Sequence, residues 1–372
     1  MKLKEFARES KKNFNGSKKD VPIVGLEHLN SGEMLFSDYD LNTENTFTKS
    51  FSKGQVLLGR RRAYLKKAAF AEFDGICSGD ITVIEAIPGK VLPELLPFII
   101  QNDKLFDFAI SRSAGGLSPR VKWKDLAEFE FDLPSLAEQK KLADKLWAAY
   151  RLKESYKKLL ASMDELAKSR FIEMFGQCGE DRFGWGVSKL GDCCIINPSK
   201  SSEARLEDEL EVSFCPMPYV SESGDIKTDE TKLYKDVKSG FTYFAEGDIL
   251  FAKITPCMEN GKGAIARNLK NGIGFGSTEF HILRPNRSII TPEWLYVLTT
   301  FKHFRKDAEA NMTGSAGQRR VPSNFLRNYK ISIPPLEMQK QYVGILEHLD
   351  KSKSELKKSI AAIDDVMKSL IN

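Results

Sequence analysis

The chain has 372 residues, of which 41% are hydrophobic, and a formal net charge of +5 at pH 7. This length suits at least two domains with ordinary cores, and a charge this mild does not by itself identify a nucleic-acid binder. No run is apolar enough to span a membrane or to form a signal peptide, so we expect a cytoplasmic protein without a membrane partner. The six cysteines form no CxxC pair and stand apart from the histidines, which predicts reduced thiols and no bound metal.

The first part of the chain, residues 1–134, is predicted to be a mixed α and β domain. Short β-branched and aromatic runs between turn residues predict strands at 21–26, 55–58 and 81–87. Pro93 and Glu94 then predict a helix that ends near Ser111, because proline suits the first helical turn and an acidic residue favours it. A strand-like segment, 129–134, closes this part with a proline.

A basic cluster follows the second predicted strand. It contains five positive charges and a tyrosine: Arg60, Arg61, Arg62, Tyr64, Lys66 and Lys67. Such side chains suit phosphates, and arginine also suits the major-groove edge of guanine, so these residues are candidate DNA contacts. A solvated basic loop is the alternative interpretation. Further along, Asp80, Glu85 and Lys90 would fit a loose metal-dependent nuclease site, although Asp80 and Glu85 more simply flank a strand.

The segment 114–120, which follows the first predicted helix, combines small residues with hydrogen-bond donors. Small residues let the backbone approach a ligand closely. A plain turn would explain the glycines but not the arginine after them. Ser118, Arg120 and Lys122 are therefore further candidate DNA contacts.

A long charged helix is predicted next, within residues 135–176. It carries apolar residues at coiled-coil spacing: Leu152, Tyr156, Leu159, Met163 and Leu166. At ~1.5 Å per residue the helix would span roughly 55 Å, which is longer than a small domain. We therefore expect it to pack antiparallel against a second helix rather than on its own domain alone.

Residues 177–334 repeat the plan of the first part, and residues 335–372 repeat the helix. Strands are predicted at 213–220, 248–252 and 279–283, and a helix from Pro292 to about Asn311. The candidate DNA contacts are Lys253, Lys262, Ser315, Gln318, Arg319 and Arg320, with Gln318 favoured as a base reader because an amide pairs well with adenine. The apolar residues of the second long helix are Leu349, Leu356, Ile363 and Leu370.

The chain thus contains one pattern twice. Arg120-Val121 and Arg320-Val321 begin an ungapped match at a constant offset of 200 residues, which runs to the end of both helices. Upstream the offset falls, to 193 between Gly54 and Gly247, so the insertions lie in the globular parts. Duplication of this kind predicts two similar halves related by an approximate two-fold axis, which suits a target with two half-sites.

The arrangement resembles the DNA-specificity (S) subunits of type I restriction-modification systems. The resemblance covers essentially the whole chain and is carried by residues 59–86, 113–143, 169–192 and 313–340. The second helix departs from the family pattern, since it opens Leu-Glu-Met-Gln from Leu336 where the family usually has Glu-Gln. The resemblance implies an α+β fold: two similar mixed α/β target-recognition domains separated by two long antiparallel coiled-coil helices, with pseudo-two-fold symmetry.

The same resemblance implies a non-catalytic reader of double-stranded DNA with a split recognition sequence. The helices would dock two methyltransferase subunits, which restriction and translocase subunits would join. The chain itself would hold no cofactor, because S-adenosylmethionine, ATP and magnesium would bind the partner subunits. The sequence agrees, since it has no adenine-methyltransferase NPPY or DPPY motif, no GxGxxG after a strand and no P-loop.

Two other classes of protein remain open from the residues. One is a coiled-coil adaptor for protein assembly, which a failure to bind duplex DNA at any salt concentration would favour. The other is a cryptic nuclease, which metal-dependent cleavage by the isolated chain would favour.

Overall fold

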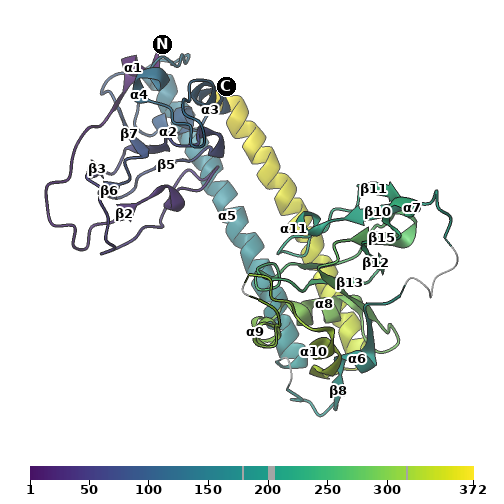
Figure 1. Ribbon diagram of the computed structural model, residues 1–372. Helices are drawn as coiled ribbons and strands as arrows, with labels where there is room; N and C mark the ends of the chain where they lie inside the picture. Colours follow the sequence, from purple (N-terminus) through teal and green to yellow (C-terminus); the bar gives the residue numbers. More distant parts are fainter. Residues whose placement is uncertain (178–179, 200–205, 316) are drawn as a thin grey trace. The chain divides into compact units, whose positions relative to one another are not determined.

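The structure is a computed structural model that describes residues 1–177, 180–199, 206–315 and 317–372 (Figure 1). The chain forms two compact units, one made of residues 1–159 and 355–372 and the other of residues 160–354. The two long helices are α5 (Leu136–Phe175) and α11 (Leu336–Ile371), close to the predicted bounds. Each unit therefore combines a globular part with a section of each long helix.

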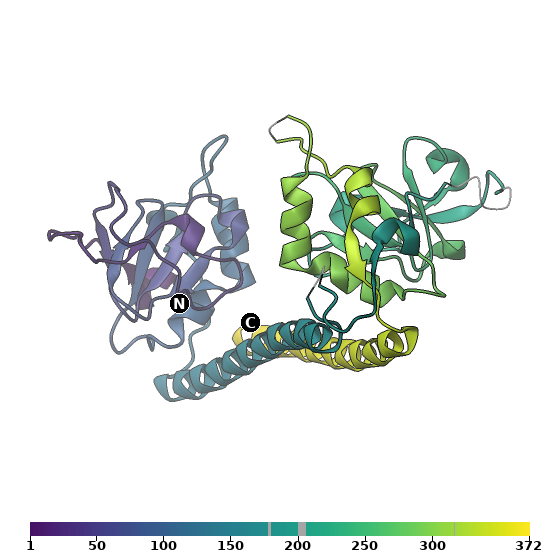
Figure 2. The ribbon, with the colours of Figure 1, turned by 90° about the horizontal axis from the view of Figure 1, so that it is seen from below.

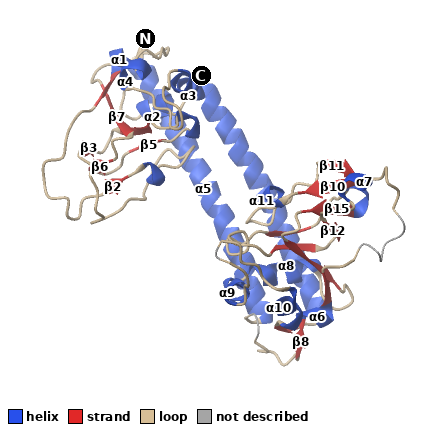
Figure 3. Cartoon of the chain, in the orientation of Figure 1, coloured by secondary structure: helices blue, strands red, loops and turns tan. Residues whose placement is uncertain are grey.

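The first unit is built on two small sheets (Figure 3). An antiparallel sheet has the strand order β1-β7-β4-β5, and a second sheet has the order β2-β6-β3 with β2 and β6 parallel. The strands are β1 (Ala7–Glu9), β2 (Ile23–Val24), β3 (Lys49–Phe51), β4 (Val56–Gly59), β5 (Ala68–Phe70), β6 (Gly75–Cys77) and β7 (Ile81–Ala86). The short helices are α1 (Leu3–Phe6), α2 (Leu96–Ile100), α3 (Asp103–Ser111) and α4 (Trp123–Leu126).

The apolar run of β4 is explained by burial on both faces of its sheet. Successive side chains of a strand point to opposite faces. Val56 and Leu58 join the core that the helices cover, whereas Leu57 joins a second core formed with the smaller sheet. The sheet therefore lies between two cores.

The second unit repeats this plan in its described part. The sheet order β14-β13-β16-β9 matches β5-β4-β7-β1, and β10-β15-β12 matches β2-β6-β3, including the parallel first pair, with β11 added at the edge. The strands are β8 (Val187–Lys189), β9 (Cys194–Ile196), β10 (Glu211–Cys215), β11 (Thr231–Leu233), β12 (Thr242–Ala245), β13 (Ile249–Ala252), β14 (Gly263–Ile265), β15 (Ile273–Gly276), β16 (Phe280–Pro285) and β17 (Lys330–Ser332). The helices are α6 (Leu190–Cys193), α7 (Tyr234–Val237), α8 (Pro292–Thr300), α9 (Lys302–Ala310) and α10 (Ser323–Asn328).

Four of the expected elements are corrected by the structure. The segment 129–134 forms one isolated bridge, between Lys2 and Glu130, in place of a strand. Each helix expected at 93–111 and 292–311 is two helices, because Asn102 and Phe301 have extended ψ angles of 137° and 135° and each starts a new helix. The Asn102 side chain also accepts a hydrogen bond from the backbone N–H of Lys104. The strand expected at 213–220 ends at Cys215, because Pro216 has no N–H and a 3₁₀ helix follows it.

Each globular part is joined to its long helix by a buried glutamine. Gln139 and Gln339 are 1% and 0% exposed. The Gln139 side chain accepts from the N–H of Leu92 and donates to the carbonyls of Lys90 and Pro134, at 2.9–3.0 Å. The Gln339 side chain repeats all three bonds at 2.8–2.9 Å, and its partners are the backbone groups of Thr291, Ile289 and Pro334. The duplication therefore extends to individual hydrogen bonds.

The long helices contact each other through ion pairs that are copies of one contact. In the first unit Lys153 Nζ lies 2.6 Å from an Asp364 carboxylate oxygen, and in the second unit Lys353 Nζ lies 2.6 Å from Asp164. Lys153 and Lys353 are counterparts at the offset of 200, as are Asp164 and Asp364. Residue i of one helix meeting residue j of the other, with the reverse also true, is the pattern of an isologous interface.

Within the second unit the sections of α5 and α11 lie side by side and run antiparallel (Figures 1 and 2). Asp164 contacts Lys353, and further along α5 the Ala167 carbonyl accepts a hydrogen bond of 3.0 Å from the hydroxyl of Tyr342, so the numbering rises along one helix as it falls along the other. Tyr342 is fully buried and packs edge-on against Phe171. The antiparallel packing that the sequence predicted is thus present.

The residues predicted to form the apolar seam are buried to different extents on the two helices. On α11, Leu349, Leu356, Ile363 and Leu370 are all partly buried. On α5, Tyr156 and Met163 are partly buried, but Leu152, Leu159 and Leu166 are 44–46% exposed. The side chains that α5 buries most deeply belong to a different stripe: Ala143, Leu146, Tyr150, Ala167, Phe171 and Phe175. The middle of that stripe carries the charged partners of the two ion pairs, which is why the sequence pattern did not show it.

The five cysteines in the described ranges are free thiols, and Cys178 lies outside them. In the part of the chain that the structure describes, no helix is both long and apolar enough to cross a membrane.

Candidate nucleic-acid interface

The loop of residues 113–120, named loop 1, follows α3 and is closed at its base. Ala114 and Arg120 exchange two backbone hydrogen bonds of 3.0 and 2.9 Å. Gly115 has φ +118°, a backbone conformation that residues with a Cβ rarely adopt. Leu117, near the tip, is 99% exposed. In Figure 2 the loop projects from its unit on the side away from the long helices. The small residues thus build a closed, projecting loop.

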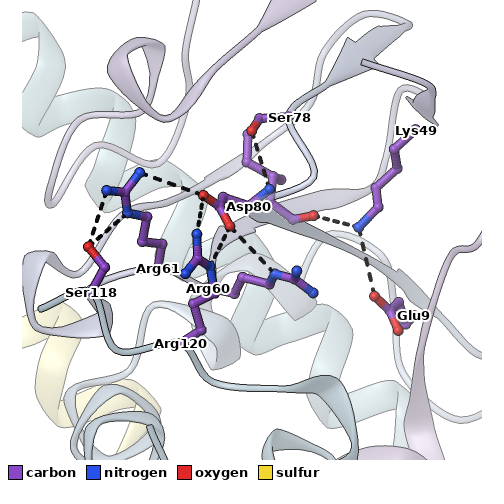
Figure 4. A network of polar contacts seen from close by, with 9 residues as sticks. Glu9, Lys49, Arg60, Arg61, Ser78, Asp80, Ser118 and Arg120 are labelled. Carbon is purple, nitrogen blue, oxygen red and sulfur yellow. Dashed lines mark hydrogen bonds and ion pairs between the residues drawn. The ribbon is translucent and has the colours of Figure 1, made fainter. Parts of the chain in front are cut away.

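Three arginines surround the carboxylate of Asp80 beside loop 1 (Figure 4). Arg120 donates from Nε and Nη2 to the two carboxylate oxygens, at 2.8 and 3.2 Å. Arg60 Nε lies 4.0 Å and Arg61 Nη1 3.8 Å from the same carboxylate, and Arg61 also donates to the Ser118 hydroxyl. The hydrogen bond from Arg120 is the main cause that lowers the pKa of Asp80, so the carboxylate is charged at neutral pH. The cluster therefore keeps a net positive charge that suits an anion.

Backbone hydrogen bonds bring these arginines together. The N–H of Arg60 donates to the Asp80 carbonyl at 2.9 Å, and the N–H of Val121 donates to the Arg60 carbonyl at 3.0 Å. Arg62, at φ +54°, donates from its N–H to the Pro119 carbonyl at 2.8 Å. The end of β4 and the end of loop 1 are thereby held side by side. Tyr64, in the 3₁₀ helix after Arg62, is 53% exposed.

The lysines predicted with this cluster are placed differently. Lys66 pairs with Asp103 at the start of α3, at 2.6 Å, and the Lys67 ammonium donates to the Leu26 carbonyl at 2.7 Å. Lys122 is an exposed residue immediately before α4. The structure therefore brings together Arg60, Arg61, Ser118 and Arg120, while the charged ends of Lys66 and Lys67 contact other groups.

The second unit has an equivalent loop, residues 313–320, named loop 2. Thr313 and Arg320 exchange two backbone hydrogen bonds of 3.0 and 2.8 Å, and Gly314 has φ +115°. Arg320 donates from Nε and Nη2 to the Glu279 carboxylate at 2.9 and 2.8 Å, and from Nη1 to the Gln318 carbonyl at 3.0 Å. The hydrogen bond from Arg320 is the main cause that lowers the pKa of Glu279. Loop 2 thus repeats the arginine and carboxylate arrangement of loop 1.

The other predicted residues of loop 2 lie on its surface. Ser315 and Gln318 are exposed, and Ala316 lies outside the described residues. The Arg319 side chain donates to the Glu309 carbonyl of α9 at 2.7 Å. The amide of Gln318 and the hydroxyl of Ser315 are therefore accessible on the same loop as Arg320.

Lys253 occupies the position that Arg60 has in the first unit. Its N–H donates to the Glu279 carbonyl, and its carbonyl accepts from Val321, both at 2.9 Å. Lys262 is placed apart, with its ammonium 3.5 Å from the Met217 carbonyl. Of these two lysines, only Lys253 is bonded to Glu279, through backbone groups, and its charge also contributes to lowering the pKa of the Glu279 carboxyl.

The predicted site did not include Asp80 and Glu279 as partners of the arginines, although the sequence contains a pattern that indicates them. Ser78-Gly79-Asp80 and Ser277-Thr278-Glu279 correspond at an offset of 199. In both segments the serine hydroxyl accepts a hydrogen bond of 3.2 Å from the N–H of the acidic residue. Both halves thus keep an acidic residue at the same position, close to basic segments. This pattern indicates that the acidic residue pairs with a basic side chain in each half.

The acidic residues of the nuclease alternative are engaged by cations and an amide. Glu85 accepts hydrogen bonds from Arg8 at 2.6 Å and Gln55 at 2.8 Å, and Asp80 faces the arginines described above. Among the described residues, no three His, Cys, Asp or Glu side chains are grouped so that they would hold a metal ion. These contacts give the nuclease alternative no support.

Comparison with known proteins identifies the family to which this chain belongs. A family model described as the type I restriction modification DNA specificity domain matches two stretches of the chain, residues 1–162 and 183–363. The two matched stretches correspond to the two halves of the duplication.

Individual relatives agree with that match. The chain is 47% identical over 161 residues to the specificity subunit of the type I restriction enzyme EcoAI from Escherichia coli, which covers 43% of this chain and 27% of the relative. It is 27% identical over 202 residues to a putative MjaX specificity subunit from Methanocaldococcus jannaschii, which covers 52% and 46%. The matches thus span less than half of the length of these curated relatives.

Two solved structures share the fold over the whole of this chain. One, from a study of complex assembly and conformational transition of the type I R-M system, matches with a TM-score of 0.55 over 98% of its own chain, at 19% identity. The other, the S subunit of a type I restriction-modification system from M. genitalium, matches with a TM-score of 0.55 over 94% of its chain, at 13% identity.

Proposed function

Because this chain belongs to the family of type I restriction-modification DNA specificity domains, we propose that it reads the DNA target of such a system. Each unit contacts one half of a split duplex sequence. Loops 1 and 2 and the cationic residues beside them supply the contacts. The relatives named specificity subunits support this proposal, as does the charge of the two loop clusters.

One observation carries the proposal. Both units hold a loop that is closed at its base by an arginine, and this arginine pairs with an acidic residue that lies beside a second cationic residue, Arg60 or Lys253. Guanidinium groups suit both phosphate oxygens and guanine, and the exposed Gln318 amide suits adenine. Two such sites in one chain match a target with two half-sites.

The partners and chemistry follow from this role. The long helices dock two methyltransferase subunits, and through them restriction and translocase subunits. S-adenosylmethionine, ATP and magnesium bind those partners, so this chain recognises DNA without catalysing a reaction. The relatives are named as specificity subunits, which supports that division of labour.

Replacing Gln318, Arg319 and Arg320 by alanine tests the proposal. We expect the base preference at one half-site to weaken or relax while that at the other is unchanged, because each unit has its own loop. The measurement is genome-wide mapping of N6-methyladenine in cells that express the variant with its partner methyltransferase. Equal changes at both half-sites would contradict independent reading.

The matched control removes the same number of positive charges elsewhere in the second unit. Lys235 and Lys238 lie in and after α7 and pair with Glu209 and Asp208 at 2.7 and 2.8 Å. Alanine at both positions should leave both half-sites unchanged.

A further inference from the structure

The arginine at the base of each loop is held by a carboxylate in a side-on geometry. Arg120 uses Nε and Nη2 on Asp80, and Arg320 uses Nε and Nη2 on Glu279. This geometry occupies one edge of each guanidinium and leaves further N–H donors on the rest of the group. The carboxylate thus sets the direction of the arginine without using all of its donors.

The backbone of each acidic residue is held in place. The N–H groups of Asp80 and Glu279 donate to a serine hydroxyl in the turn before a central strand, β7 or β16, and their carbonyls accept from the backbone N–H of Arg60 or Lys253 at the end of β4 or β13. The side chains of Asp80 and Glu279 are 21% and 27% exposed, whereas those of Arg120 and Arg320 are 44% and 41% exposed. In each pair the acidic side chain is therefore the more buried one, and the arginine side chain is the one that faces solvent.

A role in stability alone explains these pairs poorly. Exposed ion pairs contribute little to folding. Yet the same bidentate pair occurs in both units, with an aspartate in one and the longer glutamate in the other, although the surrounding loop residues differ. A shared task at the candidate DNA interface accounts for the retained geometry.

We propose that Asp80 and Glu279 are positioning residues that lower the affinity for DNA of any sequence and raise the specificity for the target. Each orients its loop arginine toward a base edge and repels phosphates that are not in register. This inference rests on the proposed function. A fixed negative charge near the DNA backbone weakens binding to any sequence, whereas an oriented arginine favours the correct base. Together the two effects increase the difference between target and non-target DNA.

The test is Asp80→Asn in the full chain, with Glu279→Gln made separately. Binding is measured to a duplex pool of random sequence, and the bound fraction is sequenced. We expect affinity for the unselected pool to rise on the order of fivefold at low salt, because about one unit of repulsive charge is lost. We also expect base preference to fall about tenfold at one position of one half-site. Each variant should affect a different half-site.

Controls separate this role from a general change of charge. Glu85→Gln removes a carboxylate that pairs with Arg8 at 2.6 Å in the first unit, and Glu293→Gln removes one that pairs with Arg267 at 2.8 Å in the second. Both should leave base preference unchanged. Asp80→Glu and Glu279→Asp keep the charge and use the acid found in the other unit, so they should restore much of the preference.

The outcomes are distinct. If Asp80→Asn changed affinity for the pool but left every base preference intact, the positioning role would be wrong. If Asp80→Asn does not fold, Glu279→Gln decides in its place, and an intact base preference at both half-sites in that variant would show that the positioning role is wrong. If the wild-type chain showed no salt-dependent binding to any duplex, the proposed function itself would fail, whatever the variants did.

Discussion

Gln139 and Gln339 show how much a single buried polar side chain contributes to this fold. Each uses its whole amide on main-chain groups, so it satisfies one donor and two acceptors that water does not reach. A buried group left without its partner costs about 1–3 kcal/mol. At each attachment of a globular part to its long helix, one side chain therefore satisfies three buried backbone groups.

We expect Gln339→Leu to lower the free energy of unfolding of the second unit by on the order of 3 kcal/mol, because three buried backbone groups lose their partner. Urea unfolding followed by tryptophan fluorescence measures the change. Gln341→Leu is the control, since Gln341 is exposed on the same helix and should change stability by less than about 0.5 kcal/mol. Similar effects of both substitutions would show that the network contributes nothing beyond the helix.

His281 makes stability depend on pH. Burial lowers its pKa below the ordinary value of 6.5, and the ring lies between the Val321 carbonyl and the Asn197 side chain. Because the unfolded chain then binds the proton more readily than the folded chain, stability is greatest above pH 6.5 and decreases as the pH falls below it.

The expected result is a decrease in unfolding free energy between about pH 7 and pH 5.5 that His281→Gln makes smaller. Urea titrations across this range measure it. His303→Gln, at an exposed position on α9, is the control. A slope that is the same in wild type and His281→Gln would exclude His281 as its source.

The residues of the site were only partly predictable. Composition identified the arginines of both loops, because basic side chains beside small residues are visible in the sequence. Which cations converge was not predictable, because Asp80 meets Arg120 only after β7 has paired with β4. Lys66 resembles its arginine neighbours in sequence but is drawn to Asp103 on α3.

For the helices and strands, sequence patterns that extend over many residues were the most informative about the fold. The duplication predicted both long helices to within a residue or two and matched the sheets of the two units. The breaks at Asn102 and Phe301 were not evident, since a residue that caps a helix looks ordinary inside an apolar run. The buried stripe of α5 escaped notice because Lys153 and Asp164 interrupt it.

The two stripes of α5 make different predictions for stability. Leu146 is fully buried, so Leu146→Ala should cost about 2–5 kcal/mol. Leu159 is 44% exposed, so Leu159→Ala should cost less than about 1 kcal/mol. Chemical denaturation of both variants provides the comparison. If Leu159→Ala were as destabilising as Leu146→Ala, the heptad seam read from the sequence would be the packed one.

For the whole molecule, the proposed division of labour makes a biochemical prediction. Incubated with S-adenosylmethionine and duplex DNA, the purified chain should transfer no methyl group to adenine, and methylation should appear when the catalytic subunit is added. Mass spectrometry of the digested DNA measures N6-methyladenine. Robust methylation by the chain alone would contradict the proposed subunit role.

The ion pairs between the long helices indicate how the two halves of the chain are related. Each helix presents both a lysine and an aspartate at equivalent positions, Lys153 and Asp164 on one and Lys353 and Asp364 on the other. A gene that encoded only one half would therefore have produced a chain able to form both pairs with a second copy of itself. Under the proposed function, such a dimer would read the same sequence on both sides of its target. A fused pair of copies keeps both ion pairs while the sequence of each half can change separately, so under the proposed function the two half-sites of the target need not be alike.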